Sequence, residues 1–402
     1  MSRNMALLGS WGWYGGEGKS GIGVCEYNDG TFREINHYYP EAIVGSPCVV
    51  TKKGYVYFIS EVRNTADLIN EGGYAYCAKL NDDKLEPVNR IKTYSPNPCY
   101  CLLDTEEKYL IVVHHSSGRD AVTKIYRDEN GEVKGRVDYN DAAIEMIEIK
   151  EDGSLGKIKD FHYHNPAFPG KRSFLHGVFS PEGTNVFIAV DKGLNSLYSY
   201  TIDYRNERLL LMDELELSYN CAPKYLCFVP HSDILYVGYE LEKTIAKVRY
   251  NVHTGKMEHL GDFDMQCPDL DILGTQDLVV NPDNQNILYI NFYEYGPNGH
   301  NLCNPKQLNN SWSQWSFDGG PTAVYVGVYD ISDQLNPILI QKIRVADNCA
   351  RRFQITPDHK YLLTLNTECD SITKLKINED GTLVLIDKQE WYRPENIYFY
   401  SI

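Results

Sequence analysis

The chain consists mostly of short runs in which hydrophobic and polar residues alternate, separated by turns rich in Pro, Asp, Glu and Gly. Alternation with a period of two is typical of β-strands with one buried face. No long stretch shows the 3.6-residue period of an amphipathic helix. One unit, HGVFSPEGTNVFIAVD at 176–191, contains a short apolar strand, a turn and a second strand. The pattern predicts an all-β protein built from antiparallel hairpins.

The same strand–turn–strand unit recurs along the chain. Further copies lie at 225–240, 277–292 and 352–367, with weaker ones at 48–61 and 100–115. The residues that mark their turns, called turn anchors below, are Thr51, Thr105, Pro181, Pro230, Pro282 and Pro357. Most intervals between anchors are about 50 residues, and two are longer, which is typical of a β-propeller with one four-stranded blade per repeat.

The two ends of the chain complete the pattern. ALLGSW (6–11) resembles the second strand of a blade that lacks its first, and NIYFYSI (396–402) can supply that strand. Their pairing would remove the exposed sheet edges that invite aggregation. We therefore expect residues 1–402 to form a single domain, a seven-bladed β-propeller of four-stranded antiparallel blades closed by pairing of the N- and C-terminal strands.

Two segments interrupt the repeat. Residues 62–73 extend one connection, and residues 293–322 form a long polar loop that carries Trp312, Trp315 and Phe317. Long insertions in compact folds are usually functional or disordered. The aromatic residues favour an ordered lid over a loop packed on the outside of the propeller.

Composition limits the possible partners. The chain carries 39 Lys and Arg against 55 Asp and Glu, a formal charge of −16. This charge argues against nucleic acid or an anionic membrane surface as a partner. The start of the chain lacks a signal-peptide pattern, and no apolar run is long enough to span a bilayer. The 11 cysteines include no CxxC pair, so we expect buried reduced thiols in a cytoplasmic protein with no metal or other cofactor. The sequence makes no prediction about the oligomeric state.

Polar residues occupy equivalent places in successive repeats. Glu61, His115, Glu240, Phe292 and Thr367 follow their turn anchors by ten residues, and Lys224, Gln276 and Arg351 precede theirs by six. Equivalent positions of a pseudo-symmetric fold lie at similar height and radius, so these residues should gather in one cleft at a mouth of the central channel. His176 precedes Pro181 by five residues, and the second strand of its unit reaches Asp191. A β-bulge or a shifted turn would reconcile the two counts.

The repeats resemble a known family. The segments GVFSPEGTNVFIAVDKGLNSLYSYTID (177–203) and APKYLCFVPHSDILYVGYELEKTI (222–245) are similar to the lactonase-type seven-bladed propellers. That group includes the propeller 6-phosphogluconolactonases and, more distantly, the fungal carboxy-muconate cyclases. The resemblance covers nearly the whole chain and implies an active cleft at one end of the channel.

The resemblance also implies roles for individual residues. His176, Glu240, Arg351 and Glu61 match polar positions of the family's cleft. The chain departs from the family at two places where arginine is usual or frequent, because these carry Lys224 and Phe292. Lysine is a point charge that lacks the planar fork of arginine, so these departures weaken the case for a phosphorylated substrate.

We expect a hydrolase that opens a small, sugar-acid-like lactone by general base catalysis without a metal ion. The predicted catalytic residues are His176, Glu240 and Lys224, and the predicted substrate-binding residues are Arg351, Glu61, His115 and Asp191. His176 would act as the base, since neutral imidazole accepts protons near pH 7, and Glu240 would orient it or share the proton of the water. Lys224 and Arg351 would stabilise the oxyanion or bind an acidic substituent.

Other interpretations stay open at this point. His176 could donate to a backbone carbonyl of the channel wall, and Lys224 with Glu240 could form a purely structural ion pair. Strand alternation places only one residue of the neighbours Arg351 and Arg352 in the channel. The alternative functions are a cycloisomerase of the muconate cyclase type, which forms or opens a lactone, and a propeller that binds a partner without catalysis.

Overall fold

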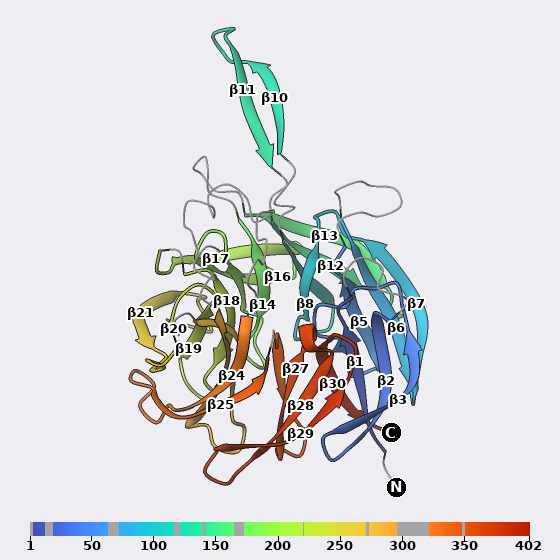
Figure 1. The fold of residues 1–402 in the computed structure, drawn as a ribbon. Coiled ribbons are helices and arrows are strands. Elements are labelled where there is room, and N and C mark those ends of the chain that lie inside the picture. The colour runs from blue at the N-terminus through green and yellow to red at the C-terminus, as the bar shows by residue number, and fades with distance from the viewer. Residues whose placement is uncertain are drawn as a thin grey trace.

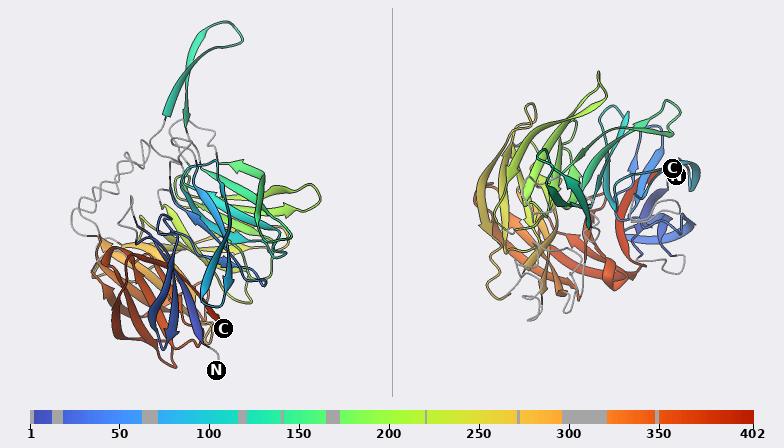
Figure 2. Two further views of the ribbon diagram at one scale, coloured as in Figure 1. Left: turned by 90° about the vertical axis from the view of Figure 1, so that its right-hand side faces the viewer. Right: turned by 90° about the horizontal axis from the view of Figure 1, so that it is seen from above.

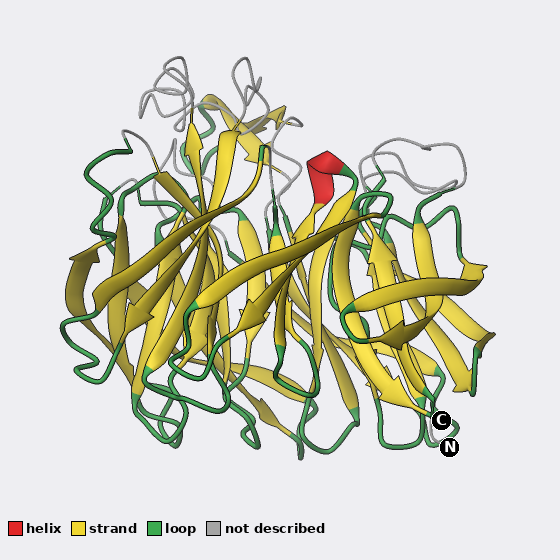
Figure 3. Cartoon of the chain, turned by 60° about the horizontal axis from the view of Figure 1, so that its bottom comes forward, coloured by secondary structure: helices red, strands yellow, loops and turns green. Residues whose placement is uncertain are grey.

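The computed structural model describes residues 3–12, 19–62, 72–115, 121–139, 142–164, 173–219, 221–270, 273–295, 321–347 and 350–402. Seven four-stranded antiparallel sheets are arranged around a central axis (Figure 1). The predicted seven-bladed propeller with four-stranded blades is therefore confirmed. Within the described residues the only helix is the short 3-10 turn η3 (Thr367–Cys369), drawn in red in Figure 3.

The seven blades follow one another in chain order, and the strands of each are named from the innermost outwards. Blade 1 contains β30 (Pro394–Ser401), β1 (Asn4–Ser10), β2 (Gly21–Asn28) and β3 (Thr31–Tyr38), and blade 2 contains β4 (Val49–Val50), β5 (Tyr55–Ser60), β6 (Tyr74–Asn81) and β7 (Lys84–Lys92). Blade 3 contains β8 (Pro98–Leu103), β9 (Tyr109–His114), β12 (Ala143–Ile149) and β13 (Leu155–Tyr163). Blade 4 contains β14 (Leu175–Phe179), β15 (Phe187–Asp191), β16 (Ser196–Asp203) and β17 (Arg208–Glu216). Blade 5 contains β18 (Pro223–Phe228), β19 (Ile234–Tyr239), β20 (Thr244–Tyr250) and β21 (Met257–Asp264). Blade 6 contains β22 (Leu273–Val280), β23 (Ile287–Tyr295), β24 (Pro321–Asp330) and β25 (Ile338–Ala346), and blade 7 contains β26 (Arg352–Ile355), β27 (Tyr361–Asn366), β28 (Ser371–Ile377) and β29 (Leu383–Glu390).

The ends of the chain close the propeller as predicted. Strand β1 pairs antiparallel with β30, with Leu7 opposite Tyr398. Arg3 and Ile402 also exchange backbone hydrogen bonds of 2.9 and 3.0 Å. The first blade therefore contains strands from both ends of the chain, which removes two sheet edges that would otherwise be exposed.

A separate hairpin explains one of the two long repeat intervals. Strands β10 (Ala121–Arg127) and β11 (Val133–Tyr139) pair with each other and are inserted between β9 and β12. Figures 1 and 2 show this hairpin standing away from the circle of blades. In the sequence, this insertion is visible only as a longer interval between two turn anchors.

The other predicted interruptions fall largely on undescribed positions. Residues 63–71 and 296–320, including Trp312, Trp315 and Phe317, lie outside the described residues. The strands that flank the second segment, β23 and β24, pair with each other in blade 6. The lid stays a prediction from the sequence.

The middle strands are buried on both faces because neighbouring blades pack against each side. Every residue of β9 (YLIVVH) and of β19 (ILYVGY) is buried. Outermost strands such as β29 expose most of their residues. This difference explains why the second strand of each repeat is an almost continuous apolar run in the sequence.

Hydrogen bonds between neighbouring blades reinforce this packing. Tyr289 of β23 donates its hydroxyl hydrogen to the carbonyl of Gly381, in the outer hairpin of blade 7, at 2.8 Å. The same hydroxyl oxygen accepts a hydrogen bond from the Asn281 side chain at 3.0 Å. Tyr57 of β5 makes the equivalent bond to Gly153, in the outer hairpin of blade 3, at 2.7 Å.

We expect Tyr289→Phe to lower the free energy of unfolding by about 1–3 kcal/mol, because two buried groups lose their partner. Urea denaturation with an unchanged m-value would measure this effect. Tyr126→Phe is the control, since Tyr126 on β10 is 44% exposed and its change should stay within about 0.5 kcal/mol. Equal effects in the two variants would contradict a role for this bond between blades.

Candidate active site

The innermost strands share one irregularity of register. In five of the blades, one residue of the innermost strand is skipped in the pairing with the second strand. The skipped residues are Glu395, Cys99, His176, Lys224 and Gln276. A β-bulge leaves the extra residue unpaired and redirects its side chain. The structure therefore contains the bulge at His176 that the sequence suggested, and the same device recurs around the axis.

Blade 7 contains a related bulge. Arg352 pairs with Leu365, while the backbone N–H of Arg351 donates to the carbonyl of that same leucine at 3.1 Å. Both guanidinium groups consequently approach Glu395, with Nε–Oε1 distances of 3.7 Å for Arg351 and 3.9 Å for Arg352. The expectation that strand alternation sends one arginine outward is wrong, because the bulge places both beside one buried carboxylate.

A second set of residues follows the second strand of each blade. The backbone N–H groups of Glu61, His115, Lys192 and Glu240 each donate to a carbonyl that precedes the innermost strand of their own blade. Lys192 thus holds in blade 4 the place that Glu240 holds in blade 5. The sequence predicts Asp191 at this place, because Asp191 follows the turn anchor Pro181 by ten residues. Counting from His176 would have found Lys192, since Glu240 follows Lys224 by 16 residues and Lys192 follows His176 by the same interval.

Lys192, Lys224 and Glu240 form a buried ionic cluster. Lys224 Nζ lies 2.7 Å from Glu240 Oε1 and 2.6 Å from the Gln276 side-chain oxygen, and Lys192 Nζ contacts Glu240 Oε2. Burial opposes ionisation of Glu240, but the two ammonium groups outweigh it and lower its pKa to about 2. Burial also lowers the pKa of Lys192 to about 8. Glu240 therefore remains a carboxylate at neutral pH and holds two cations in place.

His176 lies beside this cluster as a neutral imidazole. Its ring packs against His115 at a centroid distance of 5.3 Å and meets Tyr225 edge-on at 4.9 Å. Both ring nitrogens are buried, and within the described residues neither has a hydrogen-bond partner. Burial, followed by the charges of Lys192 and Lys224, lowers its pKa well below the usual 6.5. The bond to a wall carbonyl, and the orienting contact with Glu240, are therefore not observed within the ranges that the structure describes.

Glu61 lies at the edge of the His115 ring, the ring against which His176 packs. Trp11 Nε1 donates to Glu61 Oε2 at 2.7 Å, and Glu61 Oε1 lies 3.6 Å from His115 Nε2. Burial raises the pKa of Glu61 to about 7 and lowers that of His115 to about 3. The Arg351 guanidinium lies 4.0 Å from the centre of the Trp11 ring. Lys192, Glu395 and Trp11 are the members of this region that the sequence interpretation missed.

Two of the positions singled out in the sequence, Asp191 and Phe292, make contacts that stabilise the fold. Asp191 Oδ1 accepts three backbone N–H groups, those of Phe174, Gly193 and Leu194, at 2.9–3.0 Å. We therefore do not include it in the proposed substrate-binding set. Phe292 is fully buried and stacks on Tyr325 at a centroid distance of 5.8 Å, so this position contributes to the core of blade 6.

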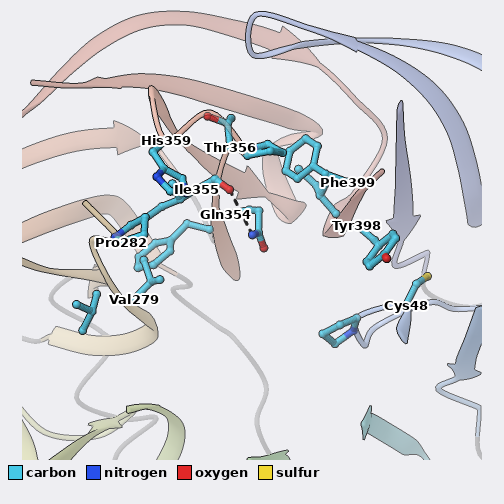
Figure 4. Close-up of a pocket in the computed structure, with 14 residues that line it drawn as sticks. Cys48, Val279, Pro282, Gln354, Ile355, Thr356, His359, Tyr398 and Phe399 are labelled. Atoms are coloured by element: carbon cyan, nitrogen blue, oxygen red, sulfur yellow. Dashed lines mark hydrogen bonds between the residues drawn. The ribbon is translucent and has the colours of Figure 1, made fainter. Parts of the chain in front are cut away.

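A separate cavity of about 540 Å³ opens toward the opposite end of the innermost strands (Figure 4). It is lined by Pro47, Cys48, Val279, Val280, Pro282, Phe353, Gln354, Ile355, Thr356, Pro357, His359, Ile397, Tyr398 and Phe399. The bulge residues and the ionic cluster do not contribute to this lining. Most of the lining is apolar, and its titratable side chains are those of Cys48, His359 and Tyr398.

The described segments contain neither a metal-binding cluster nor a membrane-spanning helix. No group of three or more of their His, Cys, Asp and Glu side chains is arranged to hold a metal ion. No helix in these segments is long and apolar enough to cross a membrane.

Comparison with known proteins extends these observations. The family model described as Lactonase, 7-bladed beta-propeller matches residues 128–397. A 6-phosphogluconolactonase of Bacillus subtilis (strain 168) is 21% identical over 228 residues, which are 54% of this chain and 58% of that protein. The aligned part thus spans little more than half the length of this curated relative.

Two solved structures share the fold over their whole length. A periplasmic gluconolactonase of Pseudomonas aeruginosa has a TM-score of 0.74 at 15% identity, with 99% of each chain covered. A protein from Lactobacillus plantarum has a TM-score of 0.75 at 16% identity, with 100% of each chain covered. Since one of these relatives is periplasmic, the cytoplasmic location stays a prediction. The family match over two thirds of the sequence, together with the seven blades, shows that the chain belongs to the lactonase family of seven-bladed β-propellers.

Proposed function

We propose that the protein is a lactone hydrolase in which His176 acts as the general base. The observation that supports this most strongly is the environment of His176, a neutral imidazole with no hydrogen-bond partner among the described residues and with Lys192 and Lys224 close enough to lower its pKa. A base of this kind can take a proton from water, and nearby cations stabilise the oxyanion that forms when hydroxide adds to the carbonyl.

The remaining residues would orient the substrate. Glu240 positions the two lysines, and Arg351 would bind an acidic or hydroxyl substituent of the lactone. His115 contributes the aromatic face against which His176 packs. This arrangement retains every predicted site residue except Asp191, and Glu240 positions the two lysines instead of orienting His176 or sharing the proton of the water.

The charge balance favours a sugar-acid-like lactone without a phosphate group. Lys192 and Lys224 share the Glu240 carboxylate, and Arg351 and Arg352 share that of Glu395. A phosphate carries close to two negative charges and binds best to several basic groups that can turn toward it. We expect the phosphorylated form of a lactone to react no faster than its unphosphorylated form at subsaturating concentration.

A panel of six-membered sugar-acid lactones, with and without phosphate, tests the proposal by titration of the acid released. In ¹⁸O-labelled water, hydrolysis places one solvent oxygen in the product, whereas cycloisomerisation places none. We expect one labelled oxygen per turnover. Product without label would favour the cycloisomerase, and no turnover of any lactone would favour a binding scaffold.

A further inference from the structure

The hydrogen-bond pattern at His115 defines where its proton lies. Nδ1 of His115 contacts the backbone carbonyl oxygen of Leu175, which can only accept. Nδ1 of the neutral ring therefore carries the hydrogen, and Nε2 carries a lone pair. Nε2 is also the atom that faces Glu61 Oε1 at 3.6 Å. Two acceptors thus face each other unless one of them holds a proton.

Glu61 is the better of the two places for that proton. Burial raises its pKa to about 7, although the Arg351 charge and the Trp11 hydrogen bond act in the opposite direction and Glu395 adds repulsion. His115 is buried as well, and its pKa falls to about 3. At neutral pH the pair is therefore best described as neutral His115 facing a Glu61 that holds its proton for much of the time.

We propose that Glu61 is the general acid of the reaction, positioned by His115 and Trp11. This assignment rests on the proposed lactone hydrolysis and changes Glu61 from a binding residue to a catalytic one. The side chain of Glu61 is 16% exposed, so its surroundings do not enclose it completely. His115 contacts both groups, with Glu61 at its Nε2 edge and His176 stacked on its ring, so the acid and the base lie next to the same side chain.

His176 and Glu61 together account for every proton that moves in the reaction. His176 takes a proton from water as the oxygen of that water forms a bond to the lactone carbonyl carbon. When the bond between that carbon and the ring oxygen breaks, the departing alkoxide takes the proton of Glu61. The proton on His176 then passes through solvent to Glu61, and lactone plus water has become the hydroxy acid.

Glu240 cannot take this role, because its surroundings act in the opposite direction. Lys192 and Lys224 hold its pKa at about 2. Two carboxyl groups in one site with oppositely shifted pKa values indicate a division between an acid and a permanently charged group. In the sequence the two residues occupy equivalent positions, because Glu61 and Glu240 each follow their turn anchor by ten residues.

Glu61→Gln is a clean test, since the glutamine oxygen can accept from Trp11 and its amide can donate to His115. Two substrates separate acid catalysis from binding: an aliphatic six-membered lactone, whose alkoxide leaving group needs a proton, and dihydrocoumarin, whose phenolate does not. We expect kcat for the aliphatic lactone to fall about 100-fold and kcat for dihydrocoumarin to change less than about tenfold, as general acid catalysis contributes roughly 10²–10⁴-fold. The wild-type kcat for the aliphatic lactone should also decline as pH rises through about 7, where Glu61 loses its proton.

Glu145→Gln is the matched control. Glu145 is another buried carboxyl whose pKa burial raises to about 7, and it lies 3.8 Å from His114 within blade 3. This variant should leave the ratio of the two kcat values unchanged. Infrared difference spectra between the wild type and Glu61→Gln should show a protonated carboxyl band below pH 7, whether or not a substrate is turned over.

The possible results distinguish the assignment of Glu61 as the acid from the proposed lactone hydrolysis. Equal losses on both lactones, no loss on either, or the absence of the carboxyl band would overturn the assignment of Glu61. A wild-type protein that hydrolyses neither these two lactones nor any sugar-acid lactone of the panel would overturn the proposed function, and the infrared band would still report separately on the proton of Glu61.

Discussion

Replacing His176 by alanine is expected to lower kcat for lactone hydrolysis by about 10²–10⁴-fold, the usual contribution of a general base. Folding should survive the change. Neither ring nitrogen of His176 bonds to the described part of the protein, so the variant loses only the packing of its ring against His115 and Tyr225. Initial rates, with circular dichroism as the check on folding, measure both parts of this expectation.

Added imidazole separates a base from a packing residue. It can enter the space that the alanine leaves, and it should restore part of the lost rate in His176→Ala but not in the wild type. A kcat for the variant within about tenfold of the wild type would exclude His176 as the base, given the size of the usual effect.

The pH dependence follows from the same environment. Burial and the charges of Lys192 and Lys224 hold the pKa of His176 well below 6.5. A base acts in its unprotonated form, which is present above its pKa, so lowering the pH from 8 to 6 should not remove activity through His176. A rate that falls below pH 7 with the titration of an ordinary histidine would contradict this environment.

The fold was accessible from the sequence because a propeller repeats one unit. Each copy carries the same apolar second strand and turn, so the spacing of residues such as Pro230 and Pro282 indicates the blades directly. Closure was accessible as well, since the lone second strand near Leu7 lacks a partner until β30 supplies it. The β10–β11 hairpin was not, because an insertion in a loop changes only the interval between repeats.

The site was harder to predict, because a β-bulge inserts an extra residue into a strand. Counting residues from a turn anchor then no longer tells which side chains face the site. Alternation fails at Arg351 and Arg352, which lie opposite the same residue. The offset from Pro181 fails for Lys192, because Pro181 follows His176 by five residues whereas Pro230 follows the equivalent Lys224 by six. Glu395 was missed for a different reason: its strand comes last in the chain and has no turn of its own to mark it.

Glu240→Gln is expected to lower the free energy of unfolding by about 3–5 kcal/mol at pH 7, since breaking a buried ion pair leaves charge without compensation. Glutamine has only one accepting oxygen, whereas Lys192 and Lys224 contact different oxygens of Glu240. Its NH2 group would therefore face one of the two ammonium groups, and it cannot balance their charges. Turnover should fall as well, because both ammonium groups lose the carboxylate that positions them. Urea denaturation and kcat measured on the same preparation would test the two effects together.

The pH dependence of this variant provides the sharper test. Burial already lowers the pKa of Lys192 to about 8, and loss of the Glu240 charge must lower it further. A lysine whose folded-state pKa lies below its unfolded value binds fewer protons when folded, so stability rises with pH between those two values. The deficit of Glu240→Gln should therefore shrink from pH 7 to pH 10, and the double variant Lys192→Met/Glu240→Gln, with one cation fewer, should regain part of the stability at pH 7. A single variant as stable as the wild type at pH 7 would mean that the three groups do not form a buried ionic cluster in solution, and the proposed source of positive charge for the oxyanion would then be lost.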